Sequence, residues 1–444
     1  MNKRIEYIKS KLDESISQVC DLSWMFSANP GRDFTRNRKL PLRKVISFLL
    51  SVEGGTLTTE MLKFFGYHTD VATTSAIVQR RRKLRPEALA TLFSLFVKKT
   101  DSEKTYKGLR LIAADGSDFK IPTNPNHPES FYPGTVQQSS YNILHLDAMY
   151  DLLQHTYIDV MLVGDRKANE KRNLYTMVDR SYIKKALVIA DRGYENYNLM
   201  AHIQEKDWFY LIRIKDLQTA VGGISSGLDL PDRDEFDLLV DLNLTKRQTS
   251  DVKKLIKDRN HYRFIPTKAT FDYLPKKNQK HQKTVFYHLP FRIVRFKITD
   301  NSYETVVTNL DEIQFPPAEL KKLYAMRWGI ETSFRDLKYT VGLLHFHSKK
   351  IDFIYQEIYA RLIMYNFSEL ITASINIPDS NSKYTYKVNF SAAVHICRQF
   401  FSGIISACDV NILLQKYISP VRPGRSRPRK TSVKYTVCFT YRVA

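Results

Sequence analysis

The stretch LYAMRWGIETSFRDLKY, residues 323–339, predicts a helix with four polar side chains along one face. They stand at offsets of 0, 3, 7 and 14 and are Tyr324, Arg327, Glu331 and Lys338. At about 100° per residue, these positions fall within an arc of roughly 60°. One carboxylate is therefore framed by a phenol, a guanidinium and an ammonium, which suits a metal-binding acid beside a phosphate backbone.

Prolines and a glycine bound this helix. Pro316 and Pro317 stand before it, where proline is tolerated in a first helical turn. Gly342 stands just past the last periodic residue, the usual place for a helix-ending glycine. The sequence therefore predicts one long helix between these residues.

Two aspartates upstream could be partners for Glu331. Asp115 follows the apolar run 111–114, Asp191 follows the apolar run 186–190, and a glycine comes soon after each. Both runs have the composition of buried strands. Adjacent strands of one sheet would bring the two carboxylates to the same edge, and Glu331 could pack across that edge.

Converging carboxylates favour a bound cation, because they cannot all stay ionised cheaply without one. The natural occupant is Mg²⁺ or Mn²⁺, since both prefer oxygen ligands. Two such ions can activate a water or a 3′-hydroxyl and stabilise the leaving oxygen in phosphodiester chemistry. Other acids in the region remain open as candidates, Asp147 being the most serious rival: Asp118, Asp147, Asp159, Asp165 and Glu195.

The segment from 108 to 214 predicts an α/β sheet with mixed strand directions. Strands are expected at about 108–122, 141–152, 156–163, 186–190 and 208–214, with helices at 169–181 and 196–206. Three strands, a helix, a strand, a helix and a strand is the order of an RNase H-like fold.

The α/β alternation stops after residue 215, and four further strands are expected before the helix at 323–339. We interpret this part as a β-rich insertion rather than an independent domain, because the helical motif comes only after it. The expected organisation is a helical DNA-binding region, the first part of the catalytic core, the insertion, the second part of the core and a helical C-terminal region with a basic tail: 1–104, 105–215, 216–304, 305–375 and 376–444.

The charge balance favours a polyanionic partner. Lys and Arg number 68 against 46 Asp and Glu in 444 residues, a net charge of +22. Such an excess is most often a mark of nucleic-acid binding, the alternative being a ribosome-associated or merely basic protein.

Residues 56–85 have the outline of a helix-turn-helix element. A helix ending near Gly66 is followed by a basic helix that contains Arg80, Arg81 and Arg82. These arginines would contact phosphates, whereas the alternative is a helical bundle with a solvated basic face. The basic loop at 275–283 and the Pro- and Arg-rich tail from Pro420 add further positive charge.

Cysteine usage and the N-terminus predict a cytoplasmic protein. Cys20, Cys397, Cys408 and Cys438 are scattered without a CxxC pair, so neither a disulfide framework nor a zinc site is expected. The first residues have no apolar segment of the secretory kind, and the longest apolar runs are too short to span a membrane.

Three blocks of the sequence resemble the catalytic blocks of bacterial DDE transposases of the insertion sequence 4 family. They are AADGSDFKIP at 113–122, VIADRGYEN at 188–196 and the Y-(2)-R-(3)-E-(6)-K signature at 324–338. The order matches, as does a β-rich insertion before the glutamate. The gaps between the acids are 191 − 115 = 76 and 331 − 191 = 140 residues.

The resemblance implies a role for each residue of these blocks. Asp115, Asp191 and Glu331 would bind the metal ions, and Tyr324, Arg327 and Lys338 would contact transposon-end DNA. Trp328 could stack on a displaced base, although a tryptophan here is more often a core side chain. His345 and His347 are interpreted as structural or phosphate-near rather than as ligands.

The resemblance also implies cut-and-paste transposition at terminal inverted repeats, with a hairpin intermediate and a homodimer on double-stranded DNA. Two alternatives stay open. One is a nuclease of the same fold without strand transfer, and the other is a non-catalytic DNA-binding protein derived from a transposase.

Overall fold

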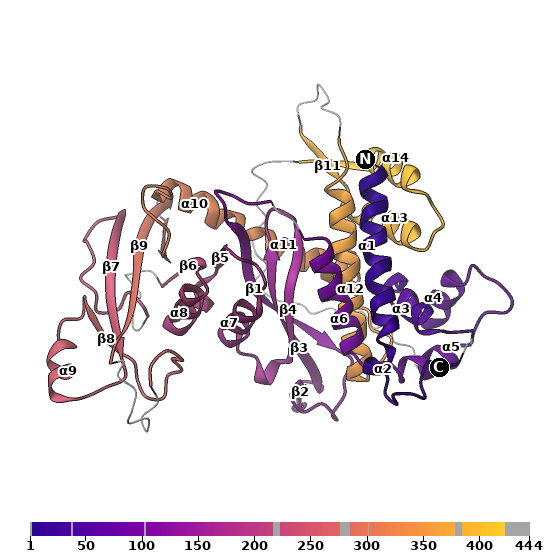
Figure 1. Cartoon of the computed structure of the whole chain (residues 1–444), viewed down its shortest axis with the longest axis horizontal. Helices are drawn as coiled ribbons and strands as arrows, with labels where there is room; N and C mark the ends of the chain where they lie inside the picture. Colours follow the sequence, from indigo (N-terminus) through magenta and orange to yellow (C-terminus); the bar gives the residue numbers. More distant parts are fainter. Residues whose placement is uncertain are drawn as a thin grey trace.

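A ten-stranded mixed sheet runs through the centre of the molecule, and a helical bundle covers one end (Figure 1). The computed structural model describes residues 2–36, 39–101, 104–215, 223–275, 285–300, 302–377 and 384–421. The expected basic loop from residue 276 and the tail from residue 422 lie outside this part of the chain. The predicted α/β class with a mixed sheet is confirmed.

Five strands form the half of the sheet that carries the acids, in the order β4-β3-β1-β5-β6. β3 pairs antiparallel with both β1 and β4, whereas β5 and β6 run parallel to β1. Two helices make the crossovers, α7 between β4 and β5 and α8 between β5 and β6. The bounds are β1 Arg110–Ile121, β3 Tyr141–Asp151, β4 Thr156–Gly164, β5 Ala186–Ala190, β6 Phe209–Arg213, α7 Glu170–Arg180 and α8 Tyr197–Glu205.

Strands of the predicted insertion continue this sheet. β10 pairs antiparallel with β6, β9 pairs with β10, and β7 and β8 follow at the outer edge, at the left of Figure 1. The four expected strands are confirmed, and a short helix, α9, lies between β7 and β8. The bounds are β7 Phe236–Thr245, α9 Ser250–Leu255, β8 Tyr262–Phe264, β9 Tyr287–Thr299 and β10 Ser302–Thr308; the small strand β2 Phe131–Tyr132 pairs with β3 at the other end.

The N-terminal and C-terminal helices form one bundle around α12, which contacts α1, α3, α6 and α13 as well as β4. α12 is buried along almost its whole length, since apolar side chains occur on all its faces and buried polar ones such as Glu357 have partners. The bounds are α1 Asn2–Asp21, α2 Ser23–Phe26, α3 Leu42–Ser51, α4 Leu57–Phe64, α5 Thr74–Arg81, α6 Glu87–Lys99, α12 Ile351–Thr372, β11 Tyr386–Val388, α13 Phe390–Phe401, α14 Ala407–Lys416 and β12 Ile418–Pro420.

The helix predicted between Pro316 and Gly342 is present as three consecutive helical segments. α10 Pro317–Met326 and α11 Trp328–Arg335 meet at Arg327, where the hydrogen bonds tighten to a three-residue spacing. A π-helical turn, η4 Asp336–Thr340, follows α11. Gly342 then ends the helix with a φ of +91°, a conformation that favours glycine.

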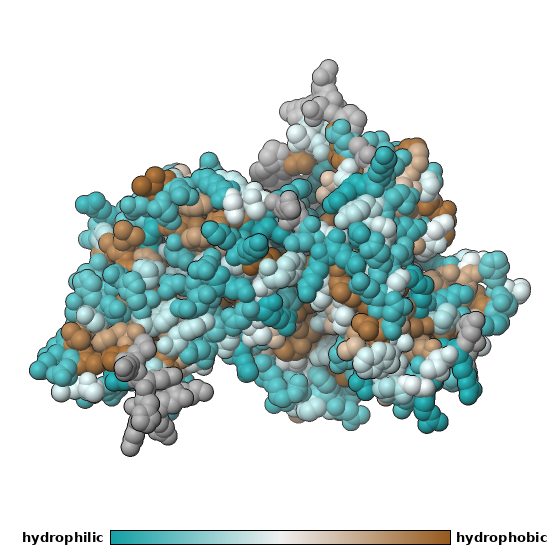
Figure 2. Space-filling model, in the orientation of Figure 1, coloured by the Kyte–Doolittle hydropathy of each residue, from teal (hydrophilic) through white to brown (hydrophobic). Residues whose placement is uncertain are grey.

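The outer face seen in Figure 2 is mainly hydrophilic, with apolar side chains gathered in separate small areas. Across the residues that the structure describes, we find no helix with the length and apolar character needed to cross a membrane.

Candidate active site

Asp115 and Asp191 lie side by side where β5 ends, although β1 continues past Asp115 to Ile121. β1 and β5 are parallel neighbours in which Ala114 is paired with Ala190, and the next residue of each chain is the aspartate. The Asp115 side chain is 23% exposed and the Asp191 side chain 43% exposed, so both can be reached from solvent. The strand register therefore brings together two acids that are 76 residues apart in the sequence.

Glu331 reaches this edge from α11, which packs against β1. Its Oε1 accepts a hydrogen bond from Arg327 Nη2 at 2.8 Å, and Arg327 Nη1 lies 3.8 Å from Asp115 Oδ2. The Arg327 side chain is almost completely buried, with the residue only 4% exposed. One guanidinium therefore links the glutamate of the helix to the aspartate of β1.

Tyr324 connects the same helical segment to the other aspartate. Its hydroxyl donates to Asp191 Oδ1 at 3.3 Å, and its ring lies near the Arg327 guanidinium. Burial raises the pKa of the Tyr324 hydroxyl well above its usual range, so this group stays a donor at neutral pH. Together, Tyr324 and Arg327 tie the helix to Asp115 and Asp191.

Lys338 is held by β1 from the π-helical turn. Its Nζ donates to Ser117 Oγ at 2.8 Å and to the Asp118 carbonyl oxygen at 2.7 Å. Burial lowers the pKa of this ammonium, and the nearby Asp118 carboxylate opposes the effect. π-helical turns occur frequently at functional sites. Here the turn brings Lys338 close to the residues that follow Asp115.

The electrostatic environment of Asp115 is that of a crowded acidic site. Burial raises the pKa of its carboxyl group to about 6. The Arg327 guanidinium and the hydrogen bond from the Gly116 amide oppose this rise, whereas the negative charges of Glu331 and Glu170 add to it. A cation bound nearby would favour the ionised carboxylate.

The donor set of Asp115, Asp191 and Glu331 consists only of carboxylate oxygens, so its chemistry fits a hard divalent cation such as Mg²⁺ or Mn²⁺. Two other groups of acidic and histidine side chains, whose ligand atoms lie closer together than those of this set, are found beside it. Two groups share His145 and have ligand atoms that all lie within 4.8 Å of one another: Asp118, His145 and Asp165, and His145, Asp147 and Glu170.

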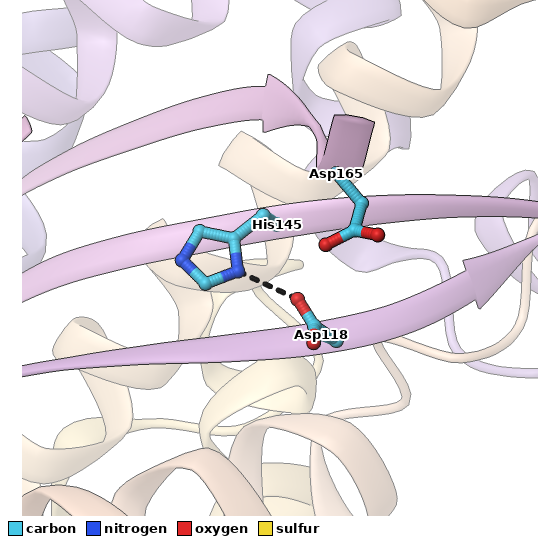
Figure 3. Close-up of side chains that lie close together, drawn as sticks. All are labelled: Asp118, His145 and Asp165. Carbon is cyan, nitrogen blue, oxygen red and sulfur yellow. Dashed lines mark hydrogen bonds and ion pairs between the residues drawn. The ribbon is translucent and has the colours of Figure 1, made fainter. Parts of the chain in front are cut away.

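Figure 3 shows the first of these groups, in which Asp118 of β1 and His145 of β3 face each other with Asp165 nearby. His145 Nδ1 lies 2.6 Å from Asp118 Oδ1. Asp165, in the short 3₁₀ helix η1 Asp165–Lys167, accepts a hydrogen bond from the Tyr132 hydroxyl. Hydrogen bonds to Asp118 and Asp147 raise the pKa of His145 to about 10 despite its burial.

The rival acids have structural partners. Asp147 is buried and accepts a hydrogen bond from Asn173 Nδ2 at 2.6 Å. Asp159 forms an ion pair with Arg180 at 2.6 Å. Glu195 accepts hydrogen bonds from the backbone amides of Lys215 and Ile224. Each of these three acids therefore has a hydrogen-bonding or ion-pair partner within the fold.

Trp328 differs from the common expectation of a core tryptophan. The residue is 56% exposed, and the Arg327 guanidinium lies 5.4 Å from the centre of its ring. It stands one residue after the buried arginine, so the helix turns its side chain outward. An aromatic face is thus open to solvent next to the acidic edge.

The arginines of α5 do not share one role. Arg81 was expected to contact phosphates, but the residue is 1% exposed and its Nη2 forms an ion pair with Glu357 at 2.8 Å, so the structure corrects this prediction. Arg80 is half-buried, with its Nε donating to the Leu40 carbonyl oxygen and its guanidinium over the Phe34 ring. Arg82 is exposed.

The histidines after the signature lie away from the acidic edge. His347 is buried between Glu357, at 3.2 Å from Nδ1, and the Gly55 carbonyl oxygen, at 3.0 Å from Nε2. Its structural interpretation is confirmed. His345 packs against Gly54, and burial lowers the pKa of its imidazole.

Sequence reasoning missed two side chains beside the acids. Arg213, the last residue of β6, has its Nη1 4.0 Å from Asp191 Oδ1 and 3.5 Å from Glu304 Oε1. Glu170 stands in the first turn of α7. Arg213 could have been found from the sequence, because it ends an expected strand that lies next to β5. Glu170 could not, because its position depends on how α7 packs against the sheet.

Comparison with known proteins assigns the family. The family model described as a transposase DDE domain matches residues 106–367, more than half of the chain. The chain therefore belongs to the DDE transposase family. Within it, the chain is of the insertion sequence 4 type, as its signature and its similarity to a transposase of that element indicate.

That relative is the transposase InsG of insertion sequence element IS4 from Escherichia coli strain K12, which is 21% identical over 299 residues. The aligned part covers 66% of this chain and spans about 59% of the length of the relative. A cryo-EM structure of the piggyBac transposase synaptic complex with hairpin DNA is also similar, with 9% identity and a TM-score of 0.40 over 96% of this chain and 85% of that one.

Proposed function

We propose that this protein is a metal-dependent transposase that cuts DNA at the terminal inverted repeats of an insertion sequence and joins the freed 3′-hydroxyl to target DNA. The observation that carries the proposal is the register of β1 and β5. It sets Asp115 and Asp191 side by side, and Arg327 ties Glu331 to the same edge.

The strand order supports an RNase H-like core for this chemistry. β4, β3, β1, β5 and β6 are neighbours in that order, with the first three antiparallel and the last two parallel to β1. In sheets with parallel strands, ligands bind outside the carboxyl ends of the strands. Asp191 lies at such an end, and Asp115 lies level with it on β1.

Asp115, Asp191 and Glu331 would hold Mg²⁺ or Mn²⁺, and we propose two ions. When bound, such ions favour deprotonation of a water or 3′-hydroxyl and stabilise the charge that develops on the leaving oxygen. Arg327 keeps Asp115 and Glu331 close by compensating their negative charges. Tyr324 fixes the orientation of Asp191 through its hydroxyl group.

The remaining signature residues would position the DNA. Lys338 presents an ammonium to a phosphate near Asp115, and Trp328 offers an exposed ring on which a displaced base can stack. Arg82 would add a phosphate contact from the end of α5, just after its last residue. We further propose a hairpin intermediate and a homodimer on paired transposon ends, with the DNA partner accounting for the positive charge of the chain.

The test uses a labelled duplex taken from the DNA that flanks the gene, incubated with the full chain, Mg²⁺ and a target plasmid. The proposal expects a nick at the repeat end followed by labelled DNA joined to the plasmid. Cleavage without joined product would identify a nuclease of the same fold. Binding without cleavage in either Mg²⁺ or Mn²⁺ would contradict the enzymatic proposal.

A further inference from the structure

The carboxylate of Glu170 lies against the two glycines that follow the aspartates. A Cβ atom built on Gly116 would stand 2.8 Å from Glu170 Oε1, and one built on Gly193 would stand 3.4 Å from Glu170 Oε2. One oxygen therefore faces the residue after Asp115 and the other faces the turn after Asp191. No other side chain within the described part of the chain is close to both glycines in this way.

Space at Gly116 is limited by the same group of side chains. A Cβ atom there would also stand 2.6 Å from His145 Nε2, a distance that non-bonded heavy atoms do not tolerate. The strand thus passes directly over Glu170 and His145 only because residue 116 has no side chain. The Gly116 amide in turn donates to Asp115 Oδ1 at 3.0 Å.

Glu170 is itself held in place from two sides. It stands in the first turn of α7, after the N-cap Asn169, whose side chain accepts a hydrogen bond from the Arg172 amide. Its Oε1 lies 3.6 Å from His145 Nε2. His145 is fixed by Asp118 at 2.6 Å and by Asp147 at 3.2 Å. The carboxylate, whose side chain is 39% exposed, therefore rests on a buried histidine that two aspartates hold in place.

We propose that Glu170 is a positioning residue of the catalytic site, whose carboxylate lies between Gly116 of β1 and Gly193 of the turn after Asp191 and keeps these two segments at a fixed separation. The inference rests on the proposed function of the aspartates. Glu170 acts through the backbone of β1 and of the turn after Asp191, and its negative charge also acts on Asp115 electrostatically. Its loss should loosen the metal site while leaving the DNA-binding surface intact.

The test compares Glu170→Gln and Glu170→Ala with the full-length wild-type chain. Mn²⁺ binding is measured by titration calorimetry without DNA, and kcat and KM are measured for cleavage of the labelled end. Groups that orient metal ligands typically contribute 10- to 100-fold, so we expect about 10-fold weaker Mn²⁺ binding and about 10-fold lower kcat. The KM for DNA should change less than about twofold.

The matched control is Asp251→Asn, which removes an acid from the first turn of α9, far out on the exposed surface. It should leave both readouts unchanged. A lower thermal midpoint of Glu170→Gln with wild-type Mn²⁺ affinity and kcat would assign a merely structural role and overturn the inference.

Two further variants separate this inference from the proposed function. Asp115→Asn and Glu331→Gln should weaken Mn²⁺ binding if the acids hold the metal. If they do so and Glu170→Gln does not, the inference alone fails. If Asp115→Asn and Glu331→Gln also leave Mn²⁺ binding and cleavage unchanged, both the inference and the proposed function fail.

Discussion

At the scale of single residues, Arg327 organises the site. It is buried, it donates to Glu331 and it lies close to Asp115, so its positive charge compensates two acids. Removing such a partner would leave uncompensated charges in a partly desolvated place. The burial of Arg327 and its two acidic partners therefore favour a role in holding the acids over direct contact with DNA.

The arginines of α5 give a sharp prediction at this scale. Arg81→Met should lower the free energy of unfolding by about 3 kcal/mol, because it leaves the fully buried Glu357 carboxylate without its ion pair. Arg82→Ala should change stability by less than about 0.5 kcal/mol and weaken DNA binding at low salt. Urea denaturation and DNA titration measure the two effects. Equal stability of both variants would contradict the burial of Arg81.

The sequence predicted the three acids as neighbours, because each carried a local signal. Asp115 and Asp191 ended apolar runs, and Glu331 stood at fixed spacing from Tyr324 and Arg327. The burial of Arg81 and the exposure of Trp328 were not predictable, because the helical period alone does not tell which neighbour a face meets. Glu170 carried no local signal, since only the passage of β1 over α7 brings it near Asp115.

At the scale of elements, the helix between Pro317 and Gly342 shows the limit of periodicity. The spacing of the signature residues predicted that this segment is helical and that Tyr324 and Glu331 lie on the same face. They did not predict the tightened turn at Arg327 or the π-helical turn, which contacts α12 and α13. The π-helical turn shifts Lys338 from the position that a regular helix would give it.

The end of this helix should be sensitive to substitution. Gly342 has a φ of +91°, and a Cβ atom there would meet only ordinary contacts, so the effect of alanine is strain in the backbone. Gly342→Ala should lower the free energy of unfolding by about 1–2 kcal/mol. Chemical denaturation measures the change. Wild-type stability would show that the helix end can adopt another conformation at no cost.

The core helix α12 carries a carboxyl group that should make stability depend on pH. Burial and the nearby Asp336 raise the pKa of Glu369 to about 8 from its usual 4.5. The folded state therefore keeps a proton that the unfolded chain releases above 4.5, so this stabilisation is complete below pH 4.5 and is lost as pH rises toward 8.

Glu369→Gln should remove this dependence. From pH 5 to pH 8, the wild type should lose on the order of 3–4 kcal/mol of stability relative to the variant. Urea denaturation of both proteins at the two pH values is the measurement. Parallel stability profiles would show that Glu369 is already ionised in the folded protein.

At the scale of the whole molecule, one continuous sheet connects the acidic edge to the outer strands. The sequence predicted the strands of the insertion but not their place beside β6, because strand pairing over such distances is decided by the shape of both edges. The helices of both ends likewise share one bundle around α12. Their separate positions in the sequence gave no indication of this.

The net charge of +22 predicts strong salt dependence of DNA binding. Each phosphate contact releases counterions, so affinity for the labelled end should fall at least about 100-fold between 50 and 200 mM salt. Fluorescence anisotropy at a series of salt concentrations measures the slope. A change below about threefold would contradict binding through the phosphate backbone.

The most direct test of the central claim is the rate of Mg²⁺-dependent cleavage of the labelled transposon end by Glu331→Gln, with Asp251→Asn as the control. Bound metal ions lower the activation free energy of such a reaction by several kcal/mol, so we predict a loss of about 1,000-fold in the cleavage rate of Glu331→Gln. Its affinity for the end should stay within about threefold of wild type, and Asp251→Asn should cleave normally. Cleavage by Glu331→Gln at the wild-type rate would contradict the assignment of Asp115, Asp191 and Glu331 as the catalytic acids.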